Sequence, residues 1–208
     1  MRNGTLTIVL VTPLVLACSG DPPSRLTQGP AEQQSFWHAL EGLCDQAFAG
    51  VLIEAPAGDT TFAGKTLTMH VRQCAAGEIR IPLHVGEDRS RTWVISRTST
   101  GLRLKHDHRH ADGSEDPISQ YGGDTSGAGS ADRQEFRADS ATAVMIPAAV
   151  TNVWIIEVVP GQRFAYALRR EGTDRRFRIE FDITKPVPLP PAPWGHGGGD
   201  PFPPSQPE

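Results

Sequence analysis

Three histidines alternate near the middle of the chain, in the stretch LRLKHDHRHADG at residues 102–113. Strand side chains two apart point to the same face, so His106, His108 and His110 would form one row. Neighbouring imidazoles in such a row lie about 6.5–7 Å apart at Cα and can hold one metal ion, whereas all three span about 13 Å and cannot. We therefore predict a candidate site for zinc, copper or nickel, formed by His108 with His106 or His110 and completed by a carboxylate such as Glu115.

Two other interpretations of the histidine row remain open. Leu102 and Leu104 precede the histidines on the same face, so the row would lie on the inner side of a strand near the point where it meets water. The histidines are then either the polar end of that strand or a contact for a small ligand or anion. The alternate positions, which we expect to face solvent, are Arg103, Lys105, Asp107 and Arg109. His70 and His84 lie on the outer faces of their strands and are also predicted to be solvated.

A turn at Asp112-Gly113 would set the pairing of this strand with the next one. The expected pairs are His110 with Glu115, Arg109 with Asp116, His108 with Pro117, His106 with Ser119, and Leu104 with Tyr121. The Arg109–Asp116 pair would be a favourable cross-strand charge pair, which supports this register.

Alternation of apolar and polar residues with period two runs through most of the chain. In RFRIEFDI, residues 176–183, every second residue is apolar and the others are charged, which is typical of an antiparallel strand with one wet face. Further segments with strand character are 51–55, 65–73, 78–85, 91–97, 101–110, 118–121, 133–138, 152–159 and 163–170. Turn signals such as Gly122-Gly123 and Pro160-Gly161 separate them, and residues 139–150 are a short helix or a loop. We predict a mainly β fold, a single antiparallel β-barrel or rolled sandwich of about ten short strands.

The amino terminus has the layout of an export signal. MRNGTLTIVLVTPLVLACSG begins with a basic residue and continues with an apolar run that is too short to span a bilayer as a stable helix. Residues 15–18, Val-Leu-Ala-Cys, resemble the lipobox of bacterial lipoproteins, in which the cysteine carries lipid. The resemblance implies a signal peptide over residues 1–17, lipidation of Cys18 and a periplasmic protein anchored to the outer or inner membrane. An ordinary secretory signal is the alternative.

The chain has three cysteines, an odd number for an exported protein. If Cys18 carries lipid, Cys44 and Cys74 remain as a pair, and an oxidising compartment predicts a disulfide between them. Residues 32–48 have Phe36 and Leu40 at helical spacing, which predicts one short helix before the strands. The disulfide would tie this helix to an early strand.

Proline and glycine are concentrated at both ends of the chain. Residues 18–31 predict a flexible tether, residues 32–194 the β-barrel domain, and residues 195–208 a disordered Pro/Gly-rich tail. We expect residues 186–194 to lie extended on the domain.

A helix followed by a meander of antiparallel strands resembles, in outline, the lipocalin-like or calycin barrels. The stretches RLKHDHRHADG and YGGDT also resemble exported proteins of Gram-negative bacteria. These resemblances imply a shape and an address, and no function comes with them. Aromatic residues that would line a hollow barrel, or fill a solid one, are Trp93, Trp154, Phe164 and Tyr166.

Charge and motifs narrow the function further. The formal net charge is −4 and no basic stripe is present, which argues against nucleic acid as a partner. GDTTFAGKT, residues 58–66, is not a phosphate loop, because Asp59 stands where the first glycine is needed and a strand pattern follows. No Gly-x-Ser-x-Gly motif is present.

We therefore expect a lipid-anchored periplasmic binding module that takes a small hydrophobic ligand, or a metal at the barrel mouth, rather than an enzyme. A structural or interaction protein of the cell envelope, with an unknown protein partner, is the alternative, and a metal-dependent enzyme comes third.

Overall fold

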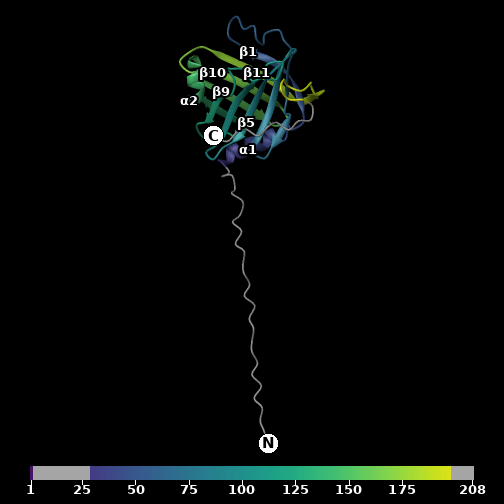
Figure 1. Ribbon diagram of the computed structural model, residues 1–208, viewed down its shortest axis with the longest axis vertical. Helices are drawn as coiled ribbons and strands as arrows, with labels where there is room; N and C mark the ends of the chain where they lie inside the picture. Colours follow the sequence, from purple (N-terminus) through teal and green to yellow (C-terminus); the bar gives the residue numbers. More distant parts are fainter. Residues whose placement is uncertain (2–28, 198–208) are drawn as a thin grey trace.

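A computed structural model describes Met1 and residues 29–197, and residues 29–197 form a β-barrel with a helix at one end (Figure 1). The helices are α1 (Ala31–Glu41), α2 (Ser140–Met145) and the single 3-10 turn η1 (Pro147–Ala149). The strands are β1 (Ala47–Glu54), β2 (Leu67–His70), β3 (Gln73–Ala75), β4 (Glu78–Val85), β5 (Asp88–Arg97), β6 (Leu102–His108), β7 (Tyr121–Thr125), β8 (Arg133–Ala138), β9 (Asn152–Val159), β10 (Arg163–Arg170) and β11 (Arg176–Val187). The predicted mainly β fold with one short helix before the strands is confirmed. Cys18, the lipobox and most of the predicted tether and tail lie outside the described residues.

The barrel closes through its first strands. Neighbours along the sheet run β2-β1-β11-β10-β9-β8-β7-β6-β5-β4, and β2 pairs with β4 as well as with β1, which completes a ring of ten antiparallel strands. The short strand β3 is an addition to this ring. It lies on the same edge of β4 as β2, because β4 pairs through Leu83 and Val85 with β2 and through Glu78 and Arg80 with β3.

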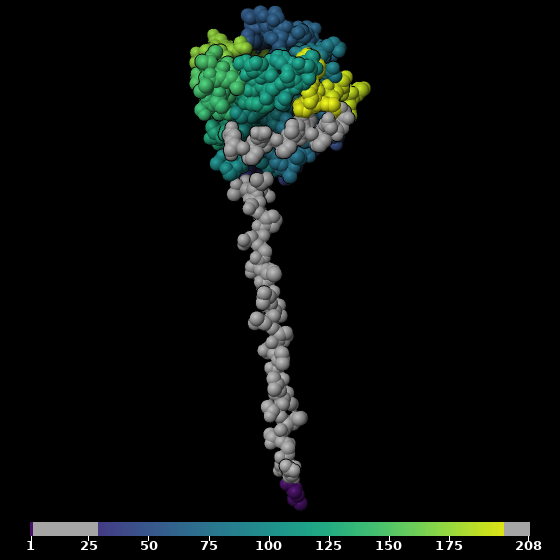
Figure 2. Space-filling view, viewed as in Figure 1, coloured from purple at the N-terminus to yellow at the C-terminus, as the bar shows by residue number. Residues whose placement is uncertain are grey.

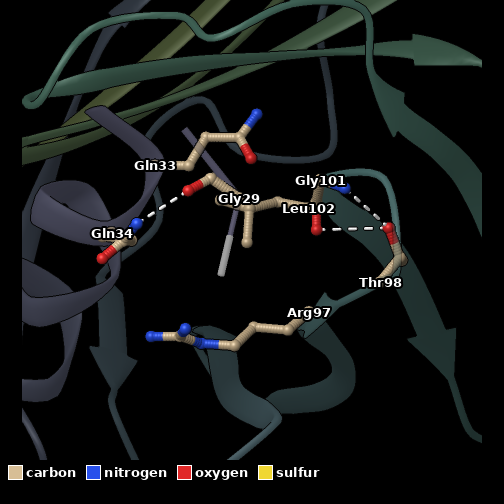
Figure 3. A pocket seen from close by; sticks show the side chains of 7 residues that line it. All are labelled: Gly29, Gln33, Gln34, Arg97, Thr98, Gly101 and Leu102. Carbon is tan, nitrogen blue, oxygen red and sulfur yellow. Dashed lines mark hydrogen bonds between the residues drawn. The ribbon is translucent and has the colours of Figure 1, made fainter. Parts of the chain in front are cut away.

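Helix α1 plugs one end of the barrel, which we call the closed end. Phe36, Trp37 and Leu40 are fully buried there, because their helical spacing puts them on one face against the barrel core. At this end the polar hollow between the start of α1 and the β5–β6 hairpin measures only about 10 Å³, about the space of a single water molecule (Figure 3). The closed end is therefore packed.

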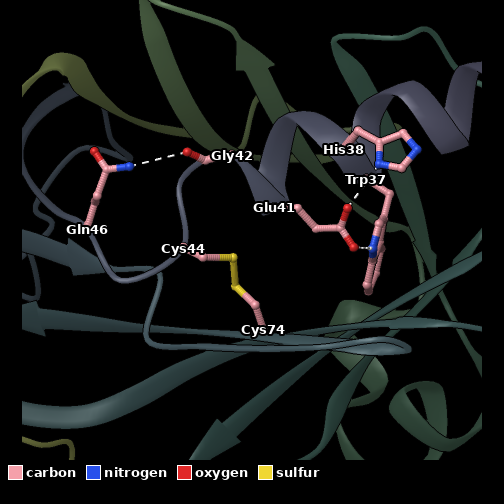
Figure 4. The surroundings of a disulfide bond; sticks show 7 residues. All are labelled: Trp37, His38, Glu41, Gly42, Cys44, Gln46 and Cys74. Atoms are coloured by element: carbon pink, nitrogen blue, oxygen red, sulfur yellow. Dashed lines mark hydrogen bonds and ion pairs between the residues drawn. A yellow bond between two sulfur atoms is a disulfide. The ribbon is translucent and has the colours of Figure 1, made fainter.

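The predicted disulfide between Cys44 and Cys74 is present, with 6.2 Å between the two Cα atoms (Figure 4). The helix is shorter than predicted: α1 ends at Glu41, and the chain reverses through Asp45, which has a φ of 62°. Cys44 therefore lies in the turn between α1 and β1, and Cys74 lies in β3. The bridge ties the closed end of the barrel to the added strand.

The residues that follow β11 pack against the outside of the barrel. We call residues 188–197 the C-terminal strap; its yellow end lies against the side of the barrel in Figure 2. The Trp194 amide donates to the Arg89 carbonyl at 3.1 Å, and Arg89 donates to the Ala192 carbonyl at 3.1 Å. Arg72 donates to the Gly197 carbonyl at 3.3 Å. The strap is thus bound to β5 and to the segment between β2 and β3.

Among the described residues, no helix has both the length and the apolar character needed to cross a membrane.

Candidate functional site

A cavity of about 530 Å³ lies at the end of the barrel opposite α1, and we call it the mouth cavity. The two ends are distinguished by β7: Thr125 at its carboxyl end contacts Gln33 of α1, whereas Tyr121 at its amino end lines the cavity. The aromatic side chains around the cavity are Phe62, Tyr121, Trp154, Tyr166 and Phe177. Its volume falls within the range of about 300–1,000 Å³ that is typical of small-ligand sites.

Two side chains hold the Tyr166 ring in place from behind. Trp93 stacks on it at 4.4 Å between ring centroids, and the Tyr166 hydroxyl lies 2.7 Å from His106 Nε2. His106 Nδ1 lies 3.1 Å from the Tyr121 carbonyl oxygen. Because a carbonyl only accepts, Nδ1 carries the proton, and Nε2 accepts a hydrogen bond from the Tyr166 hydroxyl. Burial lowers the pKa of His106 to about 3, so the imidazole is neutral and both its nitrogens are satisfied.

A second histidine–tyrosine pair lies at the cavity wall itself. The Tyr121 hydroxyl is 3.1 Å from His108 Nε2, and the Tyr121 ring also stacks on His106 at 4.5 Å between centroids. Burial lowers the pKa of His108, helped by the Arg91 guanidinium, and burial raises the pKa of Tyr121 to about 12. Both groups are therefore neutral near pH 7, so this pair contributes hydrogen-bonding groups and no charge to the cavity wall.

The predicted metal ligands are only partly brought together. His106 and His108 share the inner face of β6, as predicted, but His106 uses both nitrogens in hydrogen bonds. His110 lies beyond the strand, half exposed, with Nε2 3.9 Å from Asp116 Oδ2. Glu115 instead accepts hydrogen bonds from Ser119 and Gln120. Within residues 29–197, no three His, Cys, Asp or Glu side chains are grouped closely enough to hold a metal ion.

The four aromatic residues predicted to line a hollow barrel divide into two pairs. Trp154 and Tyr166 line the mouth cavity. Trp93 and Phe164 lie deeper, 2% and 0% exposed, with 6.0 Å between their ring centroids. The barrel is thus solid below Tyr166 and hollow above it.

The predicted register of the β6–β7 hairpin is wrong. The turn has three residues, not two: His110 donates its amide hydrogen to the Ser114 carbonyl at 2.8 Å, and Gly113 takes a φ of 89°. Arg109 therefore lies opposite Glu115 rather than Asp116. Residues 117–119 then loop out of the pairing, which brings Tyr121 opposite His106, the position predicted for Ser119.

Gly122 and Gly123 lie inside β7 and do not form the predicted turn. A Cβ on Gly122 would lie 1.9 Å from the Leu104 carbonyl oxygen, and one on Gly123 would lie 1.5 Å from the Arg137 carbonyl oxygen. The two glycines are needed because the neighbouring strands approach β7 too closely for any side chain. The segment 118–121 that was predicted as a strand is mostly loop, and only its last residue belongs to β7.

Asp107 was predicted to be solvated, but its side chain is 1% exposed. Its Oδ1 lies 2.8 Å from Arg109 Nε, and its Oδ2 lies 3.6 Å from Arg80 Nη1 and 3.7 Å from His196 Nε2. Burial alone would raise the pKa of Asp107, but His196 and Arg109 outweigh this effect and hold the pKa below its usual value. His196 belongs to the tail that was predicted to be disordered, yet it is buried as part of the strap.

His70 and His84 face outward, as predicted, but they are 5% and 6% exposed rather than solvated. Burial lowers the pKa of both and brings that of His84 to about 4, with the nearby Arg89 contributing. The strap, which binds Arg89, crosses this side of the barrel. Part of the outer face of the first strands is therefore buried, on the side where the strap packs.

The polar residues of the mouth cavity that were not predicted from the sequence are Asp59, Thr61, Asp116, Asn152, Arg170 and Arg175. Alternation along β10 places Arg170 on the same inner face as Tyr166 and Leu168, so the pattern contained a signal for it. Arg175 precedes β11 in the turn after β10, where no periodicity applies.

Comparisons with protein-family models, with curated proteins and with solved structures gave no match for this chain.

Proposed function

We propose that the protein is a lipid-anchored periplasmic binding module whose mouth cavity takes a small hydrophobic molecule. The observation that carries the proposal is the mouth cavity itself, about 530 Å³ of open space surrounded by five aromatic side chains in a barrel that is otherwise packed. Large apolar side chains normally fill a small barrel, so space left open between aromatic walls fits a ligand site.

The rigidity of the walls supports this proposal. Tyr166 and Tyr121 are fixed by hydrogen bonds to His106 and His108, and Phe62 packs on Phe177 at 4.6 Å between ring centroids. Side chains anchored in this way do not have to be ordered when a ligand binds, which favours affinity.

The leader and the disulfide support the proposed address. The basic start, the short apolar run and the lipobox-like residues before Cys18 are typical of an exported lipoprotein. The Cys44–Cys74 bridge fits an oxidising compartment. If the proposal is right, labelled palmitate is incorporated into the protein in cells and is not incorporated into a Cys18→Ser variant; equal labelling of both would contradict it.

The other hypotheses have less support. The described part of the Pro-rich tail, through Gly197, is bound to the protein's own barrel, which leaves that part less suited to a protein partner. A metal-dependent enzyme would need a ligand set that residues 29–197 do not provide.

The proposal is tested with N-phenyl-1-naphthylamine, an uncharged probe that fluoresces in apolar surroundings. The protein is exported behind a cleavable signal and starts at Ser19, so that it contains all of residues 29–197 and no lipid that could occupy the cavity. We expect saturable binding of one probe molecule. Leu168→Trp, which fills the cavity, should abolish this binding.

The matched control is Leu189→Trp, which adds the same bulk at a strap residue that is 60% exposed, and it should bind the probe like the wild type. The absence of saturable binding, or a Leu168→Trp variant that binds normally, would overturn the proposal.

A further inference from the structure

Two arginines at the mouth cavity differ from most of the other arginines of the neighbouring strands. On the outer face of β8 to β11, Arg133, Arg169 and Arg178 form ion pairs with Glu135 or Glu157. Arg170 and Arg175 line the cavity, and neither has a carboxylate within ion-pair distance in the described part of the chain. Arg169 and Arg170 are adjacent in sequence, so the difference arises from the face of β10 on which each one lies.

Arg170 is oriented by a single neutral partner. Its Nε donates to Asn152 Oδ1 at 2.9 Å, and Asn152 is itself 6% exposed and lines the cavity. This hydrogen bond fixes the guanidinium plane and leaves the two terminal nitrogens without a partner among residues 29–197. Arg175 lies beside it, since the Arg170 amide donates to the Arg175 carbonyl at 3.2 Å. Two parallel donors on a fixed guanidinium suit an oxyanion.

The two carboxylates that also line the cavity are held elsewhere. Asp59 Oδ2 accepts the amide hydrogens of Phe62 and Ala63 at 2.9 and 3.0 Å. Asp116 Oδ1 accepts the amide hydrogen of Ile118 at 2.7 Å. Each acid thus caps its own loop, and neither one neutralises Arg170 or Arg175.

We propose that the ligand is an anionic amphiphile, whose carboxylate, sulfonate or phosphate group binds Arg170 and Arg175 while its apolar body lies against Trp154. This proposal rests on the proposed function and adds the chemical class of the ligand. The charged group stays near the solvent-exposed end, since Arg175 is exposed, and the apolar body extends toward the buried floor at Tyr166.

The experiment compares two probes that differ by one group. N-phenyl-1-naphthylamine is uncharged, and 8-anilino-1-naphthalenesulfonate is the same ring system with a sulfonate. We expect the sulfonate to bind the protein that starts at Ser19 at least tenfold more tightly than the uncharged probe, because charge-assisted hydrogen bonds to the two arginines are among the strong ones. Raising the salt concentration should weaken the binding of the sulfonate and leave the affinity for the uncharged probe unchanged.

The decisive variant is Arg175→Gln, because Arg175 is exposed and its removal does not threaten folding. It should lose about tenfold in sulfonate affinity and nothing for the uncharged probe, and Arg170→Gln should lose at least as much. Arg176→Gln is the matched control: it removes the same charge one residue away, from a side chain that does not line the cavity. It should bind both probes like the wild type.

The outcomes separate the two proposals. If neither probe binds, the proposed function fails. If the uncharged probe binds but the sulfonate is no tighter, or if Arg175→Gln and Arg176→Gln behave alike, the anionic ligand class is overturned and the binding function stands. Displacement of the sulfonate by dodecanoate but not by dodecanol would support a fatty-acid-like ligand, and displacement by 2-naphthoate would support an aromatic acid.

Discussion

The two ends of the barrel use aromatic residues in opposite ways. At the closed end, Phe36 and Trp37 enter from α1 and are fully buried, and the nearby hollow measures about 10 Å³. At the mouth, Tyr121, Trp154 and Tyr166 surround a cavity of about 530 Å³. The hydroxyls of Tyr166 and Tyr121 are hydrogen-bonded to His106 and His108, and Trp154 contacts the His106 ring at 5.2 Å between centroids, so these rings are held from behind where they border the cavity. The closed end thus contributes buried core, and the mouth end leaves space for a ligand.

This contrast predicts that removing a ring at the closed end affects stability and not binding. Trp37→Ala deletes a fully buried side chain and should lower the free energy of unfolding by about 4 kcal/mol, as is typical for a large core residue replaced by alanine. Urea unfolding at pH 7 measures the loss. Among molecules that remain folded, the affinity for N-phenyl-1-naphthylamine should be unchanged. A large loss of affinity would mean that the two ends are coupled.

A second test at the closed end removes the disulfide and leaves the fully buried aromatic rings in place. The double variant Cys44→Ala, Cys74→Ala opens a loop with a sequence separation of 30 and should cost about 3.5 kcal/mol. Reduction of the wild type should lower the free energy of unfolding by the same amount and leave that of the variant unchanged. If reduction has no effect on the wild type, the bridge does not stabilise the closed end.

Acid should act on the mouth end through His106. An unfolded histidine titrates near pH 6.5, whereas burial lowers the pKa of folded His106 to about 3. Stability from the neutral imidazole is therefore complete above pH 6.5 and decreases as the pH falls, by about 2 kcal/mol at pH 5. Unfolding of the wild type and of His106→Phe at pH 7 and pH 5 measures this, and the variant should lose about 2 kcal/mol less.

His110→Phe provides the control for this pH dependence, because His110 lies half exposed beyond the strand. It should lose as much stability as the wild type between pH 7 and pH 5. If His106→Phe lost as much stability as the wild type, His106 would already be protonated at pH 5 in the folded protein, and the prediction would be wrong.

The smallest effect on stability is expected at the rim of the mouth. Phe62 is only partly buried, so Phe62→Ala should cost about 1 kcal/mol. Because its ring forms a wall of the cavity, the affinity for N-phenyl-1-naphthylamine should nevertheless fall about tenfold. Leu189→Ala, on the exposed part of the strap, should change neither quantity. A Phe62→Ala variant that binds normally would remove the loop 55–66 from the site.

Local patterns in the sequence predicted the strands and the inner faces well. Alternation assigned Phe177 and Ile179 to the inside of β11, and His106 and His108 to the inside of β6, because a side chain's face depends only on its position along one strand. The pairing of Cys44 with Cys74 followed from their number and the expected compartment. Residues 58–66, which only resemble a phosphate loop, form a loop followed by a strand, as predicted.

Contacts between distant segments could not be predicted in the same way. The register between β6 and β7 depends on residues 117–119, which loop out between the paired residues. No periodicity in the sequence predicts such a loop. The burial of Asp107 depends on His196, which belongs to a Pro/Gly-rich segment without any pattern. Arg170 and Arg175 have no carboxylate partner among residues 29–197, and this becomes distinctive only when the ion pairs of the neighbouring arginines are known.

The ring closes between strands that are far apart in the sequence, which bears on the order in which the pairs form during synthesis. The strand β1 is the first of the described strands, and one of its two neighbours is β11, the last of them. The Cys44–Cys74 bridge, by contrast, joins segments that are complete once β3 has emerged, so it can form while most of the barrel is still missing. The edge of β1 that pairs with β11 stays unpaired until residues 176–187 have been synthesised. A chain that stops before β11 would leave this edge of β1 unpaired, and an unpaired strand edge favours aggregation.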